Sequence, residues 1–261
     1  MLYGYLQDRH LILEFIKRDL RLRYMGSLLG KYWNIVNPLV MIVIYTIVFS
    51  RVMEIKTSNS SNQFSYTGYL CSGLLPWIAF SETICRGSTV FIEHGHLIKK
   101  ISFPFPVLPM AVAGSTATTF LVSWIGFMTA MPFLGMQYTS YLWCVPLIFF
   151  VQIVFSLGIC LTVSVLNTFL RDVQQITNIL IQLWFWLTPI VYLEDQIPSK
   201  LKWIILANPF AYFVNMYHQV VVFSQLPELK DMIISVLVAT LSFAIGSMIL
   251  KKFHEQIPDE V

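Results

Sequence analysis

The sequence has 261 residues, of which 12% are charged and 56% hydrophobic, with a formal net charge of +3. A soluble domain carries about 25% charged residues, so this composition excludes an ordinary soluble protein. No Asp, Glu, Lys or Arg occurs between Phe103 and Leu170, a stretch far longer than the roughly 20 residues that one membrane span needs. We therefore expect an all-α, polytopic membrane protein with no nucleic-acid partner.

Residues 11–25 predict an amphipathic helix and not a span. Apolar residues recur at i,i+4 spacing and charged residues gather on the opposite face: Ile12, Ile16, Leu20 and Tyr24 against Glu14, Lys17, Arg18 and Arg21. Asp19 and Arg23 fall on the apolar face, but they are four residues apart and can pair. We expect this helix, within residues 1–32, to lie in the cytoplasmic interface. A simple anchor of positive charge explains the same pattern equally well.

Apolar windows predict six spans, near residues 33–52, 67–86, 107–132, 141–166, 173–193 and 232–250. The second span contains Glu82 and ends at Arg86, and charge within a membrane normally faces protein or water. A buried contact between helices is the simpler interpretation of Glu82, and a substrate contact is the alternative.

The segment 203–227 is long enough to cross a membrane, but Asn208-Pro209 and Gln225-Leu226-Pro227 interrupt it. Proline removes a helical donor and restricts the residue before it. We expect a broken, re-entrant pair of outer helices between spans five and six, shielded by protein or water.

The distribution of basic residues predicts the orientation. With six spans, 12 of the 17 basic residues fall on one side, namely Arg9, Lys17, Arg18, Arg21, Arg23, Lys31, Arg86, Lys99, Lys100, Arg171, Lys251 and Lys252. The positive-inside rule makes this side cytoplasmic. Both termini, including the tail 251–261, are therefore expected inside, and the whole chain is expected to form one transmembrane domain.

The loop His94–Pro109 combines paired histidines, paired lysines and three prolines. His94 and His96 beside Glu93 lack a third nearby ligand, and catalytic zinc normally needs three, so we expect no metal site. Pro104, Pro106 and Pro109 predict a stiff, extended connection after a helical turn over residues 88–100.

In several motifs the chain resembles the membrane subunits of type 2 ABC transporters that export polysaccharides such as lipid-linked O-antigens, capsules and teichoic acids. The resemblance rests on the order and spacing of several motifs: Lys17–Tyr24, Gly30–Trp33, Asn37-Pro38, Gly73–Trp77, Leu97–Pro104, Val107–Pro109, Arg171-Asp172, Thr188–Tyr192 and Asn208-Pro209. The pair His94 and His96 departs from the pattern, since relatives more often have small or amide residues there.

The resemblance implies a six-span half-transporter of the bacterial inner membrane that forms a homodimer and pairs with two copies of a separate ATP-binding subunit. The partner would bind ATP and Mg²⁺, whereas this chain would hold no cofactor. Its coupling loop would comprise His94, His96, Leu97, Ile98, Lys99, Lys100, Phe103 and Pro104. The chain contains no P-loop motif of its own, so we expect a transport subunit without catalytic residues and not an enzyme.

The cargo is predicted from aromatic and basic residues. Aromatic faces stack on sugars, and a candidate conduit between two protomers comprises Tyr66, Tyr69, Trp77, Phe80, Trp184, Trp186 and Tyr192. Membrane aromatics also serve packing and interfacial anchoring. Lys17, Arg18, Arg21 and Arg23 are candidate ligands for the pyrophosphate of an undecaprenyl-linked glycan, although the same charges serve orientation.

Three other interpretations stay open at this point. A type 2 permease for another lipid or a drug shares the architecture. An integral-membrane glycan ligase or transferase needs convergent catalytic groups, and the outer acidic residues and His218 form no motif. A secondary transporter is expected to show internal repeats, and none is visible in the sequence.

Overall fold

A computed structural model describes residues 9–23, 65–99, 104–134, 136–193 and 202–261, together with positions 36, 40, 43, 44, 198 and 200. Within these residues the chain is helical and contains no strand. The α-helices are α2 (Arg9–Leu22), α4 (Ser65–Glu93), α5 (Gly95–Ile98), α6 (Val107–Ala130), α7 (Val145–Phe169), α8 (Asp172–Leu187), α9 (Lys202–Ala207), α10 (Pro209–Val221), α11 (Leu229–Phe253) and α12 (Ile257–Glu260). Short 3₁₀ turns, η3 (Pro132–Leu134) and η4 (Leu142–Cys144), lie between α6 and α7.

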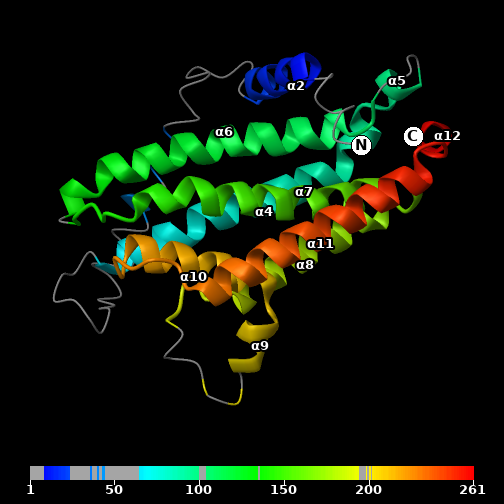
Figure 1. The fold of residues 1–261 in the computed structure, drawn as a ribbon. Coiled ribbons are helices and arrows are strands. Elements are labelled where there is room, and N and C mark those ends of the chain that lie inside the picture. Colours follow the sequence, from blue (N-terminus) through cyan, green and yellow to red (C-terminus); the bar gives the residue numbers. More distant parts are fainter. Residues whose placement is uncertain are drawn as a thin grey trace.

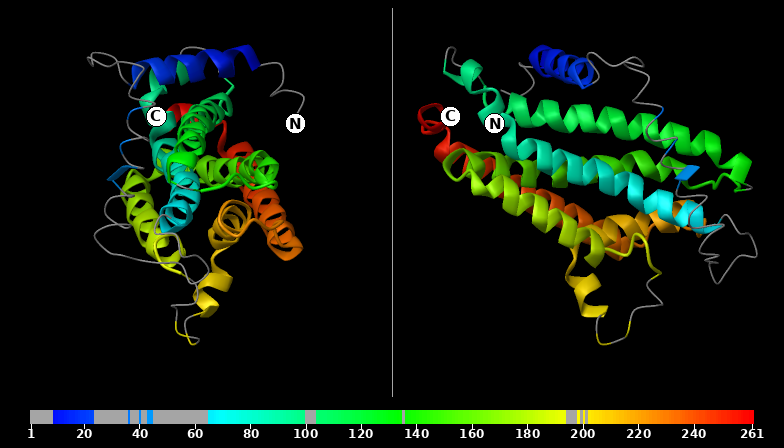
Figure 2. Two further views of the ribbon diagram at one scale, coloured as in Figure 1. Left: turned by 90° about the vertical axis from the view of Figure 1, so that its left-hand side faces the viewer. Right: turned by 180° about the vertical axis from the view of Figure 1, so that it is seen from behind.

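The long helices form an elongated bundle with α7 at its centre (Figure 1). Helix α7 contacts α4, α6, α8, α10 and α11, most extensively α11 and α4. Helix α2 crosses the outside of α6, and α5 and α12 lie together at one end of the bundle (Figures 1 and 2). We call this end the α5 end, and the opposite end, where α10 lies, the α10 end.

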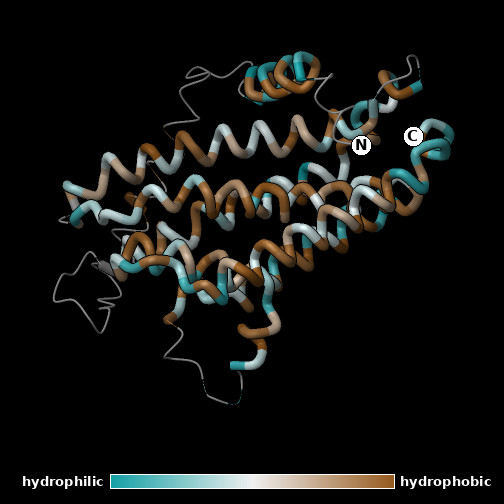
Figure 3. The backbone as a smooth tube through the Cα atoms, viewed as in Figure 1, coloured by the Kyte–Doolittle hydropathy of each residue, from teal (hydrophilic) through white to brown (hydrophobic). Residues whose placement is uncertain are grey.

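Within the part of the chain that the structure describes, three helical segments are long and apolar enough to cross a membrane: Val107–Ala130, Leu142–Phe169 and Leu229–Phe253. Figure 3 shows mostly hydrophobic colouring on α7 and α11, paler and mixed colouring on α6, both hydrophilic and hydrophobic colouring on α2, and hydrophilic colouring near α12. Helix α4 carries Glu82 and Arg86, and α8 has only 16 residues. The predicted span 33–52 lies outside the described residues, apart from four isolated positions.

The helices differ from the predicted spans in their bounds. The predicted turn over 88–100 is wrong in extent, because α4 continues to Glu93 and only Gly95–Ile98 form a separate turn. The prediction of an extended connection through Pro109 is also wrong, because α6 begins at Val107 and takes Pro109 into its first turn. A proline is tolerated there because the first-turn N–H groups have no intrahelical acceptor.

The segment 203–227 is broken where the sequence predicted. Asn208 has an extended backbone and caps α10 by accepting a hydrogen bond from the Phe210 N–H, while Pro209 occupies the first turn. The Asn208 side chain also donates to the Leu187 carbonyl and the Thr188 hydroxyl. The helix break therefore ties the start of α10 to the end of α8.

Helices α7 and α11 approach so closely that only glycine fits between them. A Cβ on Gly158 would lie 2.4 Å from the backbone N of Phe243, and one on Gly246 would lie 2.3 Å from the Gly158 carbonyl oxygen. Small residues at such crossings let backbones pack tightly in membrane proteins. The position of α11 therefore depends on this glycine pair.

We predict that Gly158→Ala lowers the free energy of unfolding by about 1–3 kcal/mol, because overpacked backbone cannot move aside as a side chain can. Thermal unfolding of the detergent-purified protein measures this. Gly68→Ala is the matched control, since its Cβ would meet only the flexible end of Met136. Equal unfolding temperatures for the two variants would contradict the prediction.

Candidate functional site

Helix α2 is held against the bundle by an apolar contact along α6. The Ile16 side chain approaches Gly114 of α6 so closely that a Cβ there would lie 2.3 Å from Ile16 Cδ1. Lys17, Arg18 and Arg21 are exposed on the other side of the helix. The amphipathic division predicted from the sequence is thus used to pack α2 on protein as well as to expose its basic face.

Four charged side chains meet where α2 faces α4. Arg23 Nη1 lies 2.7 Å from Glu82 Oε1, and Arg23 Nε lies 3.4 Å from Asp19 Oδ2. Arg86 pairs with Asp19 through Nη2 and lies 3.5 Å from Glu82 through Nη1. Each carboxylate therefore contacts both guanidinium groups. We call these four residues the charge cluster.

Hydroxyl groups of α6 complete the charge cluster. Arg23 donates to Ser115 Oγ and Thr119 Oγ1 at 3.2 Å each, and Arg86 donates to Ser115 Oγ at 3.3 Å. The four charged side chains are only 14–32% exposed. A partly buried charge is costly when unpaired, so the geometry favours all four partners being present together.

Asp19 of α2 pairs with Arg86 of α4 and with Arg23, and so links the two helices. Burial alone would raise the pKa of its carboxyl, but the hydrogen bonds from Arg86 and Ser115 and the charges of Arg86 and Arg23 outweigh it and lower the pKa below its usual value. Asp19 therefore stays ionised at neutral pH, and its attraction for the two arginines is retained.

The charge cluster confirms part of the sequence analysis and revises another part. The predicted Asp19–Arg23 pair is present, and Glu82 makes the predicted contact between helices. Arg23 is paired with Asp19 and Glu82. Of the four predicted phosphate ligands, the other three, Lys17, Arg18 and Arg21, are exposed. The partnership of Asp19 with Arg86 was missed; the only signal was that Arg86 follows Glu82 by one helical turn.

The predicted coupling loop is compact at the α5 end. His94 lies between α4 and α5, with its Nδ1 3.0 Å from the Val90 carbonyl oxygen and its ring edge-on to Phe15 of α2 at 6.1 Å. Ile98 is buried, whereas His96 and Lys99 are exposed and Leu97 is half-buried. Pro104 opens the turn into α6 by accepting from the Val107 N–H at 3.0 Å. Lys100 and Phe103 lie outside the described residues.

Most of the predicted conduit aromatics are buried in the core of the subunit. Tyr66, Tyr69, Trp77 and Phe80 are between 0% and 5% exposed. Phe80 packs on Phe210, with ring centroids 4.3 Å apart. In this arrangement these four side chains offer a cargo no surface. Trp184 and Tyr192 are partly buried, and Trp186, at 65% exposed, is the most open of the seven.

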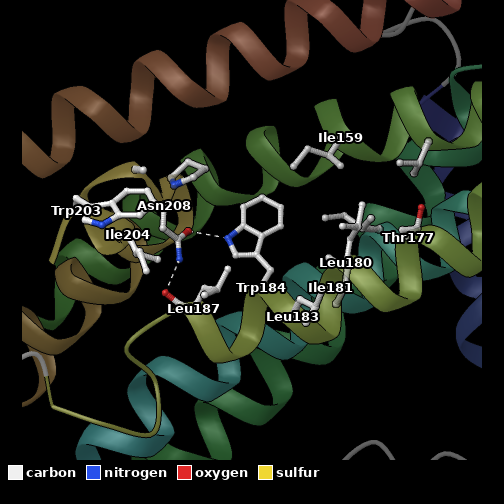
Figure 4. A pocket seen from close by; sticks show the side chains of 14 residues that line it. Ile159, Thr177, Leu180, Ile181, Leu183, Trp184, Leu187, Trp203, Ile204 and Asn208 are labelled. Atoms are coloured by element: carbon white, nitrogen blue, oxygen red, sulfur yellow. Dashed lines mark hydrogen bonds between the residues drawn. The ribbon is translucent and has the colours of Figure 1, made fainter. Parts of the chain in front are cut away.

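An apolar groove of about 600 Å³ runs along α8 towards α9 and α10 (Figure 4). Trp184 points into it and donates from its indole N–H to Asn208 Oδ1 at 2.7 Å. The rest of the lining is mostly aliphatic, from α8, α7 and α9, and includes Leu180, Leu183, Ile159, Trp203 and Ile204. The groove suits a hydrocarbon chain or another apolar helix.

We predict that the charge cluster behaves as a coupled unit. Arg86→Asp leaves three carboxylates around Arg23, and Asp19→Arg leaves three cations around Glu82, so each should lower the free energy of unfolding by about 1–3 kcal/mol. The double variant restores two charges of each sign and should recover at least half of the loss. Thermal unfolding of the four proteins completes the double-mutant cycle.

The exposed Glu14–Lys17 pair on the same helix is the control, with side chains 71% and 64% exposed. Reversing both of its charges should change stability by no more than about 0.5 kcal/mol, because surface pairs contribute little. If the double variant loses as much stability as the sum of the losses in Asp19→Arg and Arg86→Asp, the charge cluster is not a unit.

Comparison with known proteins agrees with these features. The ABC-2 type transporter family model matches residues 10–222. Two proteins of Klebsiella pneumoniae named O-antigen export system permease protein RfbA are 35% and 36% identical, over 80% and 83% of this chain and 78% and 81% of theirs. A protein of the same name from Myxococcus xanthus is 28% identical over 98% of this chain and 96% of its own.

The matched region extends from α2 through the charge cluster, the α5 turn and the broken helix to the end of α10. Together with the apolar helices, this identifies the chain as a multi-pass membrane protein that belongs to the ABC-2 type transporter family.

Proposed function

We propose that this chain is the permease subunit of an ATP-driven exporter that moves an undecaprenyl-linked polysaccharide, such as an O-antigen, across the bacterial inner membrane. The observation that carries the proposal is the similarity, over about four fifths of the chain, to proteins named as O-antigen export permeases. The energy would come from a separate ATP-binding subunit that docks at the α5 end.

The distribution of charge supports a cytoplasmic location for the α5 end. Exposed basic residues lie on α2, at the C-cap of α5, at the N-cap of α8 and in the last turn of α11, namely Lys17, Arg18, Arg21, Lys99, Arg171, Lys251 and Lys252. The positive-inside rule favours the cytoplasm for such an end. The six-span topology with both termini inside follows if residues 33–52 provide the first span and the α9–α10 pair is re-entrant.

The charge cluster supports a rigid-body mechanism of coupling. A push on α5 acts on the end of α4, and the paired charges join α4 to α2 and, through Ser115 and Thr119, to α6. These elements would then move together when the ATP-binding subunits close. Pro104 and Pro106 would limit how much of the displacement the α5–α6 connection absorbs.

The arrangement of cations and apolar surface supports a lipid-linked cargo. Arg18 lines a cavity of about 260 Å³ between α2, α4 and α6, next to Glu93 and His94. With Lys17 and Arg21 it would attract the pyrophosphate. Helix α8 exposes an apolar stripe that includes Leu180, Leu183 and Trp186. In a homodimer this stripe would face the conduit or the second copy.

The proposal predicts that the tagged protein, purified from its own host, brings down a P-loop subunit and that the complex hydrolyses ATP. Deleting the gene should remove polysaccharide from the cell surface and cause lipid-linked glycan to accumulate inside. Normal surface glycan in the deletion strain would favour a permease for another lipid or a drug. A partner-free protein with transferase activity would favour the enzyme interpretation.

We predict that replacing both Pro104 and Pro106 by Gly uncouples ATP hydrolysis from export. The two rings fix the backbone φ angles of the turn into α6, and glycine would let that turn absorb the motion. Assembly and ATP hydrolysis should persist while export falls several-fold, measured as surface glycan per assembled complex. Full export by this variant would refute the role given to the prolines.

A further inference from the structure

The segment after α11 folds back to the α5 end of the bundle. Residues 254–256 form a turn, and Ile257 at the start of α12 is 0% exposed. Ile257 belongs to the same buried cluster as Ile98 of α5, Phe91 of α4 and Val165 of α7. The short helix is therefore anchored in the apolar layer that lies beneath α5.

A second contact joins this segment directly to α5. Gly95 is buried, and a Cβ built on it would lie 2.4 Å from Val261 Cγ1 and 3.5 Å from Val261 Cβ. With valine at position 261, a side chain at position 95 would collide with Val261 Cγ1. The absence of a side chain here permits the first turn of α5 to rest on Val261.

Helix α5 needs such support because it is a single turn of four residues. Isolated helices shorter than about 12–15 residues are marginal in water, so the position of α5 must come from packing. A turn that receives force from a partner can pass it on only if its underside is fixed. Val261 contacts that underside, and Ile257 lies in the apolar cluster that contains Ile98 of α5.

The exposed faces of the two segments differ in charge. Lys99 is exposed at the end of α5, and Asp259 and Glu260 are exposed on α12. Figures 1 and 2 show α5 and α12 side by side at this end in views from opposite directions. A partner that covers both segments would complement them with acidic residues opposite Lys99 and basic residues opposite Asp259 and Glu260.

We propose that residues 257–261 are a fixed buttress for α5 and form, together with α5, one docking surface for the ATP-binding subunit. The inference rests on the proposed function, because it takes the occupant to be that subunit. It adds a second segment, far from α5 in the sequence, to the surface on which the partner pushes. The buttress positions α5 and stays in contact with it while the transporter works.

A disulfide between positions 95 and 261 tests the contact and its permanence. The 3.5 Å between the built Cβ of Gly95 and the Cβ of Val261 matches the 3.5–4.5 Å range of disulfides. In a background without the four native cysteines, the double variant Gly95→Cys/Val261→Cys should cross-link completely under mild oxidation. Export by the oxidised protein should equal export by the same protein after reduction. Failure to cross-link, or export that returns only on reduction, would overturn the fixed buttress.

Two sets of substitutions test the docking surface. Ile257→Asp should lower the partner recovered on co-purification at least tenfold, whereas Ile257→Val should not. The double variant Asp259→Lys/Glu260→Lys should also lower the recovered partner at least tenfold. It should not change the thermal unfolding of the isolated permease, because both side chains are exposed. Glu228→Lys, an exposed acid at the α10 end, is the control for charge reversal.

The outcomes separate this inference from the proposed function. If the unmodified protein binds an ATP-binding subunit and exports glycan, and both tail variants do so equally well, only the inference is wrong. If the unmodified protein recovers no such subunit, the proposed function fails and the docking surface fails with it.

Discussion

Two carboxylates and two guanidinium groups, partly shielded from water, constrain how this protein can be assembled. Any one of the four left without its partners would cost several kcal/mol. Asp19 lies on α2 and Arg23 directly follows that helix, Glu82 and Arg86 lie on α4, and α6 supplies the hydroxyl of Ser115 to both arginines. Shifting α2 by one turn would separate both pairs that join it to α4, Arg23–Glu82 and Asp19–Arg86. The charge cluster therefore fixes the register of an amphipathic helix that apolar contacts alone would hold at several positions.

The same constraint determines which parts of the subunit can move. Helix α4 has 29 residues and would be about 43 Å long at 1.5 Å per residue, so it connects the α5 end to the α10 end. Along its length it packs through Phe80 and Trp77 into an aromatic core shared with α7, α8 and α10. Close-packed interiors transmit strain and do not absorb it. Displacement at α5 is thus more readily passed on as a movement of joined helices than lost in local repacking.

The sequence predicted local features well and long-range partners poorly. The i,i+4 pair Asp19–Arg23 follows from spacing, the break at Asn208-Pro209 from the backbone chemistry of proline, and the start of α6 at Val107 from the apolar window. The partnership of Asp19 with Arg86 depends on how α2 crosses α4, and no periodicity encodes that crossing. Trp77 and Phe80 were assigned to a conduit because aromatics suit sugars, but hydrophobic burial decided their place. The coupling role of His96 and Lys99 stays a prediction, although both are exposed where that role requires.

The placement of the basic residues divides them into two groups, as the helical spacing of residues 11–25 predicted for α2. Arg23 and Arg86 face inward and are neutralised by Asp19 and Glu82. Lys17, Arg18 and Arg21 face outward. A guanidinium that holds two carboxylates cannot also take a pyrophosphate without leaving those carboxylates unpaired. Binding of an anionic lipid at the outer group leaves the inner pairs intact. Recognition of a headgroup and maintenance of helix register can therefore operate on the same short helix without competing for the same charges.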